Sequence, residues 1–359
     1  MKLTPKVTFL IPCYNASKYI VDALNCVVKQ TYQNLEIILI DDGSTDNTLT
    51  LLQQFAQKDD RIVLIKNEQN LGLIRTLNKG VELATGDYIA RFDADDIIGT
   101  DRIEKQIEIV NRNSTIELIT SYVNYITPSG KFHSQAESFY CYTFNSIKFL
   151  NLFECPLVHA GMLIKSSILK NVKYNYKSEF MHIEDHELFT KLINQGVNIF
   201  VNRDKNQKYL YRRNLSSVSN RHKSVQVENA INMAKLNIKS FLNYEVDTKL
   251  LEPLVLKNKI EWSTDLIKNS FDEFKRIKNT FINKENINLS ALDKKLINNW
   301  YHLRSLKIIS TILLQGNISC KLLSIYYFFL NAKFILNIKF WKNLISRFVY
   351  IFNSIRYHY

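Results

Sequence analysis

Three aspartates within four positions are the side chains in this sequence best suited to binding a cation. Asp93, Asp95 and Asp96 follow a short apolar run that starts at Tyr88. On an extended backbone Asp93 and Asp95 point the same way, because they are two residues apart. Two carboxylates on one side suit Mg²⁺ or Mn²⁺ when a bound diphosphate supplies further oxygen ligands. The alternative is a solvated loop in which Asp96 or Asp101 caps the next helix.

The segments before these aspartates alternate between strands and helices. Apolar runs of strand length occur at residues 6–11, 35–40 and 62–65, and a fourth begins at Tyr88. Between them we expect helices over residues 17–29, with Ser17 as the cap, over a segment ending near residue 56, and over residues 73–84. Four strands separated by three helices predict right-handed crossovers and a largely parallel sheet. The fold class is therefore α/β, of a kind that binds nucleotides.

Each of these four strands ends in polar or turn-forming residues. The carboxyl ends of parallel strands meet at one edge of the sheet, so we expect these residues to lie together. Asp41 can accept a hydrogen bond from the imide N–H of a nucleotide base, with Asp42 as the alternative, and Tyr14 can stack on the base. The four groups are Pro12-Cys13-Tyr14-Asn15, Asp41-Asp42-Gly43-Ser44, Asn70-Leu71-Gly72 with Arg75, and Asp93-Ala94-Asp95-Asp96.

The pattern is less regular beyond residue 101. A helix follows, then a strand over residues 118–126 and a hairpin turn at residues 128–130. A strand over residues 157–164 contains His159, and a helix that starts at residues 183–186 contains Glu184 and Asp185. The last strands are expected at residues 197–201 and 208–211.

Length and composition indicate two units with different net charges. With 359 residues, 46% of them hydrophobic, the chain can form a mixed α/β domain over residues 1–220 and a helical region over residues 221–359. The first part carries 25 Lys and Arg against 24 Asp and Glu, and the second 22 against 10. The five cysteines are scattered without a C-x-x-C pair, and no signal-like apolar run starts the chain, so we expect a cytoplasmic protein with reduced thiols.

The basic end of the chain predicts an anionic partner. Residues 296–359 contain no acidic side chain. The apolar run at residues 322–330 is about half the length that crosses a bilayer, so a helix lying on a membrane surface fits better than a span. Packing of the same apolar stripe on the first domain is the alternative. The stripe comprises Trp341, Leu344, Ile345, Phe348, Phe352 and Ile355.

Taken together, the four groups at the strand ends closely resemble glycosyltransferase family 2, whose inverting enzymes use nucleotide-sugar donors. The resemblance covers residues 6–105, continues more weakly through Glu184-Asp185 and Tyr211-Arg212, and does not reach the basic end. It implies the GT-A fold, a Rossmann-like, mostly parallel sheet flanked by helices, here with a C-terminal helical and basic extension. It also implies a UDP-sugar donor, a saccharide acceptor and a β-linked product. A lipid-linked acceptor at the inner face of the cytoplasmic membrane would explain the basic amphipathic end, so we expect surface polysaccharide or lipooligosaccharide synthesis.

The resemblance also assigns roles. Asp41 is the base-binding aspartate, Asp95 holds Mn²⁺ or Mg²⁺, and Asp93 contacts the ribose or the metal. Asp185 is the general base, and Glu184 orients the acceptor or raises the base's pKa. Three other residues have roles that local sequence leaves open. His159 either lies near the acceptor or is structural, and Arg75 and Arg212 either bind the nucleotide diphosphate or are surface charges. The remaining donor-binding candidates are Pro12, Tyr14, Asn15, Asn70 and Ala94.

Other functions fit the sequence less well. A sugar nucleotidyltransferase needs a glycine-rich loop after its first strand to hold a triphosphate, but Pro12-Cys13-Tyr14-Asn15 contains no glycine. A nucleic-acid-binding protein fits the sequence pI near 9.3, yet no nucleic-acid motif is present and the basic residues lie in an amphipathic helix. A catalytically inactive nucleotide-sugar binder would have little need of the acidic residues. The sequence is compatible with an oligomer but does not specify one.

Overall fold

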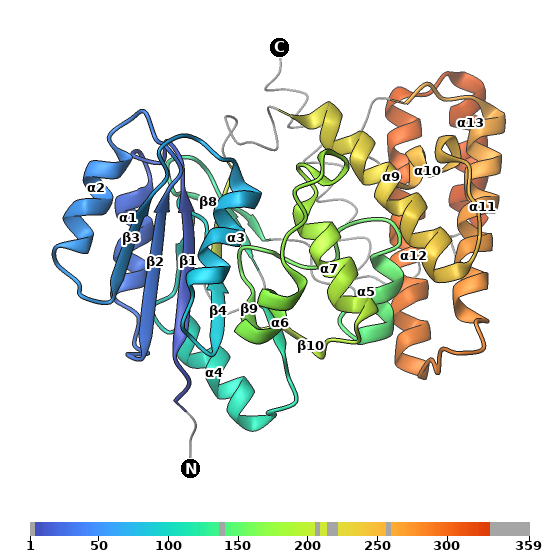
Figure 1. The fold of residues 1–359 in the computed structure, drawn as a ribbon. Coiled ribbons are helices and arrows are strands. Elements are labelled where there is room, and N and C mark those ends of the chain that lie inside the picture. Colours follow the sequence, from blue (N-terminus) through green and yellow to red (C-terminus); the bar gives the residue numbers. More distant parts are fainter. Residues whose placement is uncertain are drawn as a thin grey trace. The chain divides into compact units, whose positions relative to one another are not determined.

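The computed structural model describes residues 4–121, 123–135, 141–204, 209–213, 222–255 and 260–330. The chain divides into two compact units, Met1–Phe241 and Leu242–Tyr359. The first unit contains both strands and helices, and all elements described in the second are helices (Figure 1).

A seven-stranded sheet forms the centre of the first unit. Its order is β10-β6-β9-β4-β1-β2-β3, and all neighbours are parallel except β9, which runs antiparallel to β4 and β6. The largely parallel sheet predicted from the sequence is therefore confirmed. Its strands are β1 (Val7–Cys13), β2 (Leu35–Asp41), β3 (Ile62–Lys66), β4 (Tyr88–Arg91), β6 (Leu118–Ser121), β9 (Leu163–Lys165) and β10 (Ile199–Asn202).

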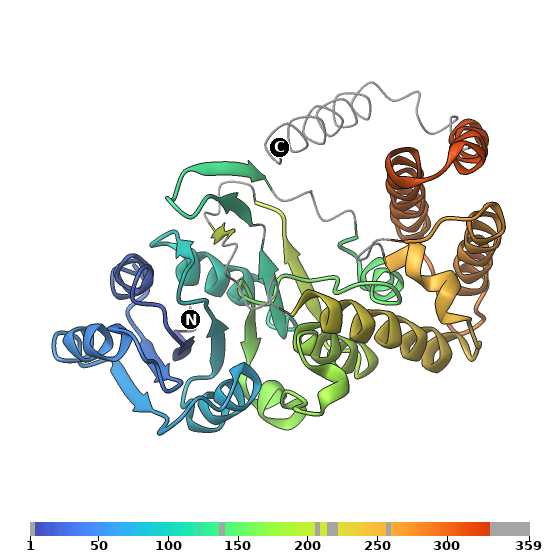
Figure 2. The ribbon, with the colours of Figure 1, turned by 90° about the horizontal axis from the view of Figure 1, so that it is seen from above.

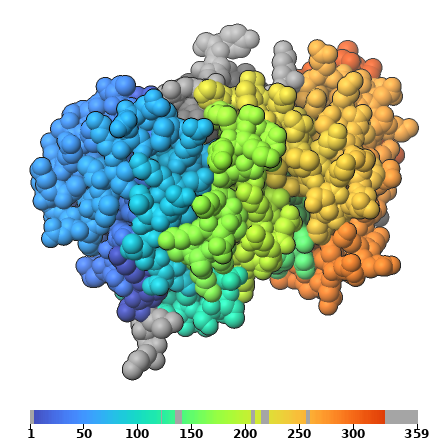
Figure 3. Space-filling view, in the orientation of Figure 1, coloured from blue at the N-terminus to red at the C-terminus, as the bar shows by residue number. Residues whose placement is uncertain are grey.

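Helices cover both faces of this sheet, which explains why its central strands are continuous apolar runs (Figure 2). Phe9 and Ile11 of β1 pack on one face with α1 (Ile20–Val28), α2 (Thr48–Ala56) and α4 (Arg102–Arg112). Leu10 packs on the opposite face with α3 (Leu73–Leu83), α6 (Ser166–Val172) and α7 (Glu184–Asn194). Helices α3, α6 and α7 form part of the outer surface in Figure 3. The alternation of side chains along β1 thus builds two separate apolar cores.

A second, smaller sheet has the order β5-β11-β7-β8. Strand β11 (Tyr209–Arg212) pairs antiparallel with β5 (Ile97–Ile98) and parallel with β7 (Asn124–Ile126). The predicted hairpin is confirmed, because β7 pairs antiparallel with β8 (Phe132–Gln135). Strand β5 directly follows Asp96, so this sheet is joined to the acidic loop.

Two predicted strands are wrong in extent. Residues 118–126 form two strands, β6 and β7, in different sheets, since a run of apolar residues does not show where the chain changes sheet. Residues 157–162 are not a strand, and only Leu163–Lys165 pairs as β9. Leu157 and Met162 are nevertheless buried, so the apolar run reflects burial of a loop. The predicted Ser17 cap is also wrong: α1 begins at Ile20, and the Ser17 N–H donates to Asp46 at 3.1 Å.

The first unit continues beyond its last strand. It also contains α5 (Phe144–Leu150), a 3-10 turn at Ser178–Phe180 and nearly all of α9 (Lys223–Leu242). The sequence analysis placed α9 in the C-terminal region because its composition resembles that region. Its contacts instead place it with the sheet, so the compact units divide about 20 residues later than the composition shift near residue 220.

The second unit contains α10 (Thr248–Val255), α11 (Thr264–Ile282), α12 (Ala291–Gln315) and α13 (Ile318–Leu330). Ser290 and Asp293 form a reciprocal cap at the start of α12. The Arg304 guanidinium donates to the Leu254 and Val255 carbonyls at 2.6 and 3.1 Å, which joins α12 to the end of α10. Within the described residues, none of the helices has the length and apolar character needed to span a bilayer. The amphipathic stripe from Trp341 to Ile355 lies outside the described residues.

Candidate active site

The loop after β1 is joined to the loop after β2 by Asn15. Asn15 has a left-handed backbone, with φ +47°, which asparagine tolerates better than most residues. Its Oδ1 accepts from the Thr45 and Asp46 N–H groups at 2.8 and 3.3 Å. Pro12 lies inside β1, beside β2. Tyr14 is 45% exposed, so its ring is available to a ligand.

Asp41 and Asp42 are both buried at the end of β2, but they have different surroundings. Asp42 accepts from the Leu71 and Gly72 N–H groups at 2.9 and 3.0 Å and from the Asn67 side chain at 2.8 Å. Among the residues that the structure describes, Asp41 Oδ2 accepts one long bond, 3.3 Å, from the Ser44 N–H. Asp41 Oδ1 has no hydrogen-bond partner among the described residues. Asp42 therefore organises the loop after β3, while Asp41 retains a carboxylate oxygen that no described residue satisfies.

The loops after β2 and β3 are in direct contact at Gly43. A Cβ on Gly43 would lie 2.6 Å from the Asn70 nitrogen and the Gln69 carbonyl carbon, and its φ is +69°. Only glycine fits this position without displacing backbone. Asn70 Oδ1 accepts from the Gly72 N–H at 2.9 Å. Arg75, three residues after Gly72, is exposed on α3.

Asp93, Ala94 and Asp95 follow β4 at the same edge of the sheet. Asp93 forms an ion pair with Arg91, whose side chain is 3% exposed. Ala94 is buried, and the Asp96 N–H donates to the Asp93 carbonyl at 3.3 Å, so the segment turns sharply. Burial and the charge of Asp93 raise the pKa of Asp95 to about 6. Burial and the neighbouring carboxylate therefore both disfavour the charged form of Asp95.

Asp96 holds strand β11 against this acidic loop. Its carboxylate accepts from the Tyr209 hydroxyl at 2.7 Å and from the Arg212 N–H at 2.8 Å. Burial, with Asp93 and Asp95 nearby, raises its pKa well above the usual range. Asp96 therefore contributes to the architecture of the loop and is not positioned to bind a ligand.

Arg212 is largely occupied by the protein. Its Nε donates to the Asp95 carbonyl at 2.7 Å and its Nη1 to the Pro128 carbonyl at 2.9 Å. The guanidinium also lies 4.6 Å from the centre of the Tyr19 ring. Only Nη2 has no hydrogen-bond partner within the described part of the chain, so Arg212 can offer a diphosphate one donor at most.

Two buried arginines next to the acidic loop were not identified from the sequence. Arg91 and Arg102 are both buried. Arg102 donates to the Arg91 and Met162 carbonyls, both at 3.2 Å. Buried charges need opposite charges nearby, and Asp93 and Asp96 provide them. The signal that was available was Arg91 itself, a charged residue inside an otherwise apolar strand.

Glu184 and Asp185 begin α7 and lie close to the acidic loop. Burial and the adjacent Asp185 raise the pKa of Glu184 to about 7, Arg91 opposes this rise, and Asp93 adds to it. Glu184 is therefore near enough to Arg91 and Asp93 for their charges to act on it. Asp185 Oδ1 accepts from the His186 N–H at 2.7 Å, as expected at a helix N-terminus.

His159 reaches this edge because β9 runs antiparallel to β4, so the residues that precede β9 lie where β4 ends. Its Nε2 lies 2.7 Å from the Tyr174 hydroxyl. Burial and the charge of Arg91 hold the pKa of His159 well below its usual value, so the ring is neutral. Asn78 of α3 hydrogen-bonds both the N–H and the carbonyl of Tyr174. The His159 ring therefore contacts a tyrosine whose own backbone is fixed by α3.

The acidic loop fits a divalent cation only in part. Asp93 and Asp95 each carry carboxylate oxygens of the kind that bind Mg²⁺ or Mn²⁺. Across the described ranges, however, no group of three or more His, Cys, Asp or Glu side chains is arranged to hold a metal ion. A cation here would therefore need further oxygens from a diphosphate and from water, which is the usual arrangement for Mg²⁺.

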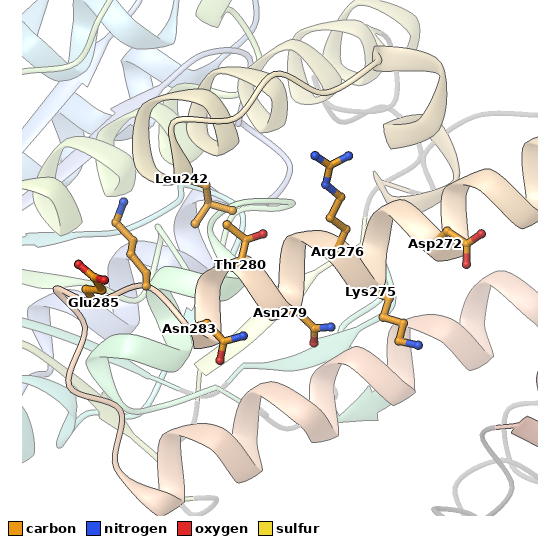
Figure 4. Close-up of a pocket in the computed structure, with 9 residues that line it drawn as sticks. Leu242, Asp272, Lys275, Arg276, Asn279, Thr280, Asn283 and Glu285 are labelled. Atoms are coloured by element: carbon orange, nitrogen blue, oxygen red, sulfur yellow. The ribbon is translucent and has the colours of Figure 1, made fainter.

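A surface cavity of about 710 Å³ lies in the second unit, along α11 (Figure 4). Basic and acidic side chains are mixed along it, so it lacks the single charge that would select a nucleotide. None of its lining residues has a role in the site described above. They are Leu242, Asp272, Lys275, Arg276, Asn279, Thr280, Asn283, Lys284 and Glu285.

Comparison with known proteins gives a consistent result. Residues 8–172 match the family model described as glycosyl transferase family 2. An uncharacterised glycosyltransferase of Haemophilus influenzae is 31% identical over 263 residues, which cover 71% of this chain and 80% of that protein. An uncharacterised glycosyltransferase of Methanocaldococcus jannaschii is 34% identical over 191 residues, covering 53% of this chain and 65% of that protein.

The fold is also similar to a solved structure. The crystal structure of residues 1–349 of TarS from S. aureus, in complex with UDP-GlcNAc, superposes with a TM-score of 0.57 and 17% identity. The match covers 84% of this chain and 91% of that one. The architecture predicted from the sequence, a GT-A fold followed by C-terminal helices, is thereby confirmed.

Proposed function

The chain belongs to glycosyltransferase family 2, and on this basis we propose that it transfers a sugar from a UDP-sugar to a saccharide acceptor with inversion at the anomeric carbon. The observation that carries the proposal is the buried, unpartnered Oδ1 of Asp41 at the carboxyl edge of the sheet. A buried carboxylate oxygen without a donor is costly, and the imide N–H of uracil would satisfy it. The half-exposed ring of Tyr14 would stack on the same base.

Asp95 and Asp93 would hold the diphosphate end of the donor through Mn²⁺ or Mg²⁺. The cation, when bound, would act as a Lewis acid that stabilises the charge developing on the departing UDP. Arg91 fixes the Asp93 carboxylate by their ion pair, and Arg212 fixes the backbone of Asp95. These contacts keep both acids at the end of β4, where the sugar diphosphate of a donor held by Asp41 would reach.

Asp185 would take the proton from the acceptor hydroxyl as it attacks the anomeric carbon. A single displacement on an α-linked donor gives a β-linked product, and it needs only one general base. Glu184, the residue before Asp185 at the start of α7, would orient the acceptor hydroxyl. The supporting observation is electrostatic proximity: Glu184 feels the charges of Arg91 and Asp93. His159 remains neutral beside Tyr174 and would contribute a hydrogen bond on the acceptor side.

We place the enzyme at the inner face of the cytoplasmic membrane, acting on a lipid-linked acceptor in surface polysaccharide synthesis. The support comes from α13, on which Ile318 is 78% exposed, Leu322 64% and Tyr326 58%. These positions are four residues apart, so their side chains form one apolar stripe on the helix. No acidic residue occurs from Leu296 onward, so an anionic lipid surface would attract this region.

A donor panel tests the proposal. UDP-, GDP- and CDP-sugars are incubated with the protein and Mn²⁺, and nucleotide release is measured. We expect UDP release from a UDP-sugar. Asp95→Ala and Asp185→Ala should each lower the rate at least 100-fold without lowering the melting temperature by more than a few degrees. Asp60→Ala, which removes an exposed aspartate, is the matched control. Binding of UDP-sugars without turnover in the wild type would instead identify an inactive nucleotide-sugar binder.

A further inference from the structure

The Glu184–Asp185 pair is held on both sides by side-chain amides from a single helix. Helix α9 follows the last strand of the first unit, beyond the 8–172 segment that matches the family model. Gln226 and Asn229 hydrogen-bond the chain immediately before the acidic pair, and Asn237 hydrogen-bonds Asn151 and Thr190 of α7. We refer to these three as the α9 amide triad.

Two members of the triad hold the segment that leads into the acidic pair. Gln226 Nε2 donates to the His182 carbonyl at 2.9 Å. Asn229 Nδ2 donates to the Met181 and Ser178 carbonyls at 3.0 and 3.3 Å. These carbonyls belong to the 3-10 turn and the two residues after it, so the backbone of this loop is fixed by donors from outside the loop.

His182 needs such support because its backbone is left-handed, with φ +66°. This region is unfavourable for a residue that carries a Cβ, and a non-glycine residue remains there only when surrounding contacts hold it. The His182 ring also stacks on the His222 ring, with the ring centres 4.4 Å apart and the planes 8° from parallel. His222 directly precedes α9, so the start of this helix contacts both the backbone and the side chain of His182.

The third member of the triad holds the helix that carries the acidic pair. Asn237 Nδ2 donates to the Asn151 carbonyl at 2.7 Å and lies 3.3 Å from Thr190 Oγ1. His186 Nε2 lies 3.0 Å from the same Asn151 carbonyl. His186 and Thr190 both belong to α7, one and five residues after Asp185. Asn237 thus fixes the first turns of α7 from the side.

The triad lies along one face of α9. The spacing from Gln226 to Asn229 and Asn237 corresponds to a single helical stripe, together with the buried Ala230 and Met233. Asn229 and Asn237 are at most 8% exposed. Buried amides require hydrogen-bond partners, so this face specifies one docking position for α9 on the loop and on α7.

We propose that the α9 amide triad is a positioning element that orients Glu184 and Asp185 toward the donor site. The inference rests on the proposed function for the role of the acidic pair. The triad residues act through the Ser178–His182 loop and through α7, and they do not touch the donor. Loss of Gln226 and Asn229 should therefore loosen the loop and reduce turnover while the UDP site remains intact.

The test compares the Gln226→Ala/Asn229→Ala double variant with wild type in two independent measurements. Hydrogen–deuterium exchange reports on the loop without requiring activity. We expect exchange in peptides spanning residues 178–187 to rise at least 10-fold, and exchange in residues 35–46 to stay unchanged. The second measurement is UDP release from UDP-GlcNAc with Mn²⁺. We expect kcat to fall at least 10-fold while the Kd for UDP, measured by calorimetry, changes less than twofold.

Asn232→Ala is the matched control, because Asn232 is an exposed amide on the same helix. It should leave both measurements at wild-type values. Should the double variant fail to fold, Gln226→Leu retains side-chain bulk without the donor and is measured in the same way. Unchanged exchange in residues 178–187 would overturn the inference, as would faster exchange with unchanged kcat. Absence of UDP binding and release in the wild type would count against the proposed function, and the exchange measurement would still decide whether the triad holds the loop.

Discussion

The Asp96 carboxylate accepts the main-chain N–H of Arg212 at 2.8 Å, which joins the acidic loop after β4 to the last strand of the second sheet. The second oxygen of Asp96 accepts the Tyr209 hydroxyl. Arg212 in turn donates to the Asp95 carbonyl, so the two segments are linked in both directions. The conformation of the proposed metal-binding acids therefore depends on a strand more than 100 residues away in the sequence.

Removing the Tyr209 hydroxyl should destabilise this link. In Tyr209→Phe, Asp96 Oδ2 loses a donor at a site where Asp96 is only 1% exposed. An unsatisfied buried acceptor costs roughly 1–3 kcal/mol. We expect the free energy of unfolding from urea titration to fall by about that amount. Tyr176→Phe alters a tyrosine that is 67% exposed and should change it by less than about 0.5 kcal/mol.

Substitution of Gly43 should be much more costly than substitution of another left-handed glycine. Gly43→Ala places a Cβ 2.6 Å from backbone atoms of Gln69 and Asn70. The two loops must then separate, so we expect a loss of more than about 2 kcal/mol of stability and weaker binding of UDP. Gly196→Ala is the control. Gly196 has a similar φ of +73°, but a Cβ added to it would meet no atom within 4 Å apart from its own chain neighbours. Its cost should be only about 1 kcal/mol. Equal losses in the two variants would mean that loop contact is unimportant.

The base specificity should depend on Asp41. A carboxylate accepts from the imide N–H of uracil but is repelled by the N3 acceptor of cytosine. Asp41→Asn supplies a donor in place of one oxygen, so the ratio of the Kd values for CDP and UDP should fall at least 10-fold. Calorimetry with both nucleotides measures this ratio. If Asp42→Asn shifted the ratio more than Asp41→Asn, the base-binding role would belong to Asp42.

The rate should rise with pH through the titration of Glu184, whose pKa burial and Asp185 raise to about 7. Above that pH Glu184 is ionised, so its carboxylate can accept a hydrogen bond from the acceptor hydroxyl beside Asp185. We therefore expect kcat for UDP release to increase between pH 6 and 8. In Glu184→Gln this inflection should be absent. An unchanged pH profile in the variant would assign the titration to another group.

The stability of the same variant gives an independent check of that pKa. The folded chain keeps Glu184 protonated up to about pH 7, whereas the unfolded chain loses this proton near the ordinary value of 4.5. As pH rises through this window, the unfolded state releases the Glu184 proton before the folded state does. Glu184 therefore lowers the free energy of unfolding of the wild type as pH rises. Relative to wild type, Glu184→Gln should gain on the order of 2 kcal/mol between pH 5 and pH 8. Urea titrations at the two pH values measure the difference.

Charge on the apolar stripe of α13 should abolish attachment to anionic lipid. Ile318→Glu/Leu322→Glu places two carboxylates on a stripe whose side chains are 78% and 64% exposed, so the fold should tolerate them. We expect the wild type to pellet with phosphatidylglycerol-containing vesicles and the variant to stay in the supernatant. Leu236→Glu, at an exposed position on α9, is the control. Equal pelleting of both variants would reject α13 as the contact.

The four strand ends could be predicted from the sequence because each signal is local. An apolar run followed by turn residues shows where a strand stops, and the crossover rule then brings the ends of β1, β2 and β4 to one edge. Local signals cannot show which of two neighbouring acids keeps a free oxygen. Asp41 and Asp42 look alike in the sequence, and they differ only because the loop after β3 donates to Asp42.

Two other features of the structure also depend on contacts between distant segments. Arg212 resembles an anion-binding arginine, but its Nε and Nη1 donate to carbonyls of residues 95 and 128, both of them distant from Arg212 in the sequence. Helix α9 resembled the C-terminal region in composition, yet its buried amides pair with the first unit. Side-chain hydrogen bonds between segments far apart in the chain leave no periodic pattern in either segment.

The position of α9 determines where a shortened version of this enzyme can end. A polypeptide shortened to residue 220 would keep every recognisable motif, from Pro12 to Arg212. It would nevertheless lack the donors that hold the His182 and Asn151 carbonyls. Shortened versions of this transferase should therefore end after residue 241, and chimaeras should be joined there. With an earlier end or junction, we expect the protein to bind the nucleotide but to transfer sugar poorly.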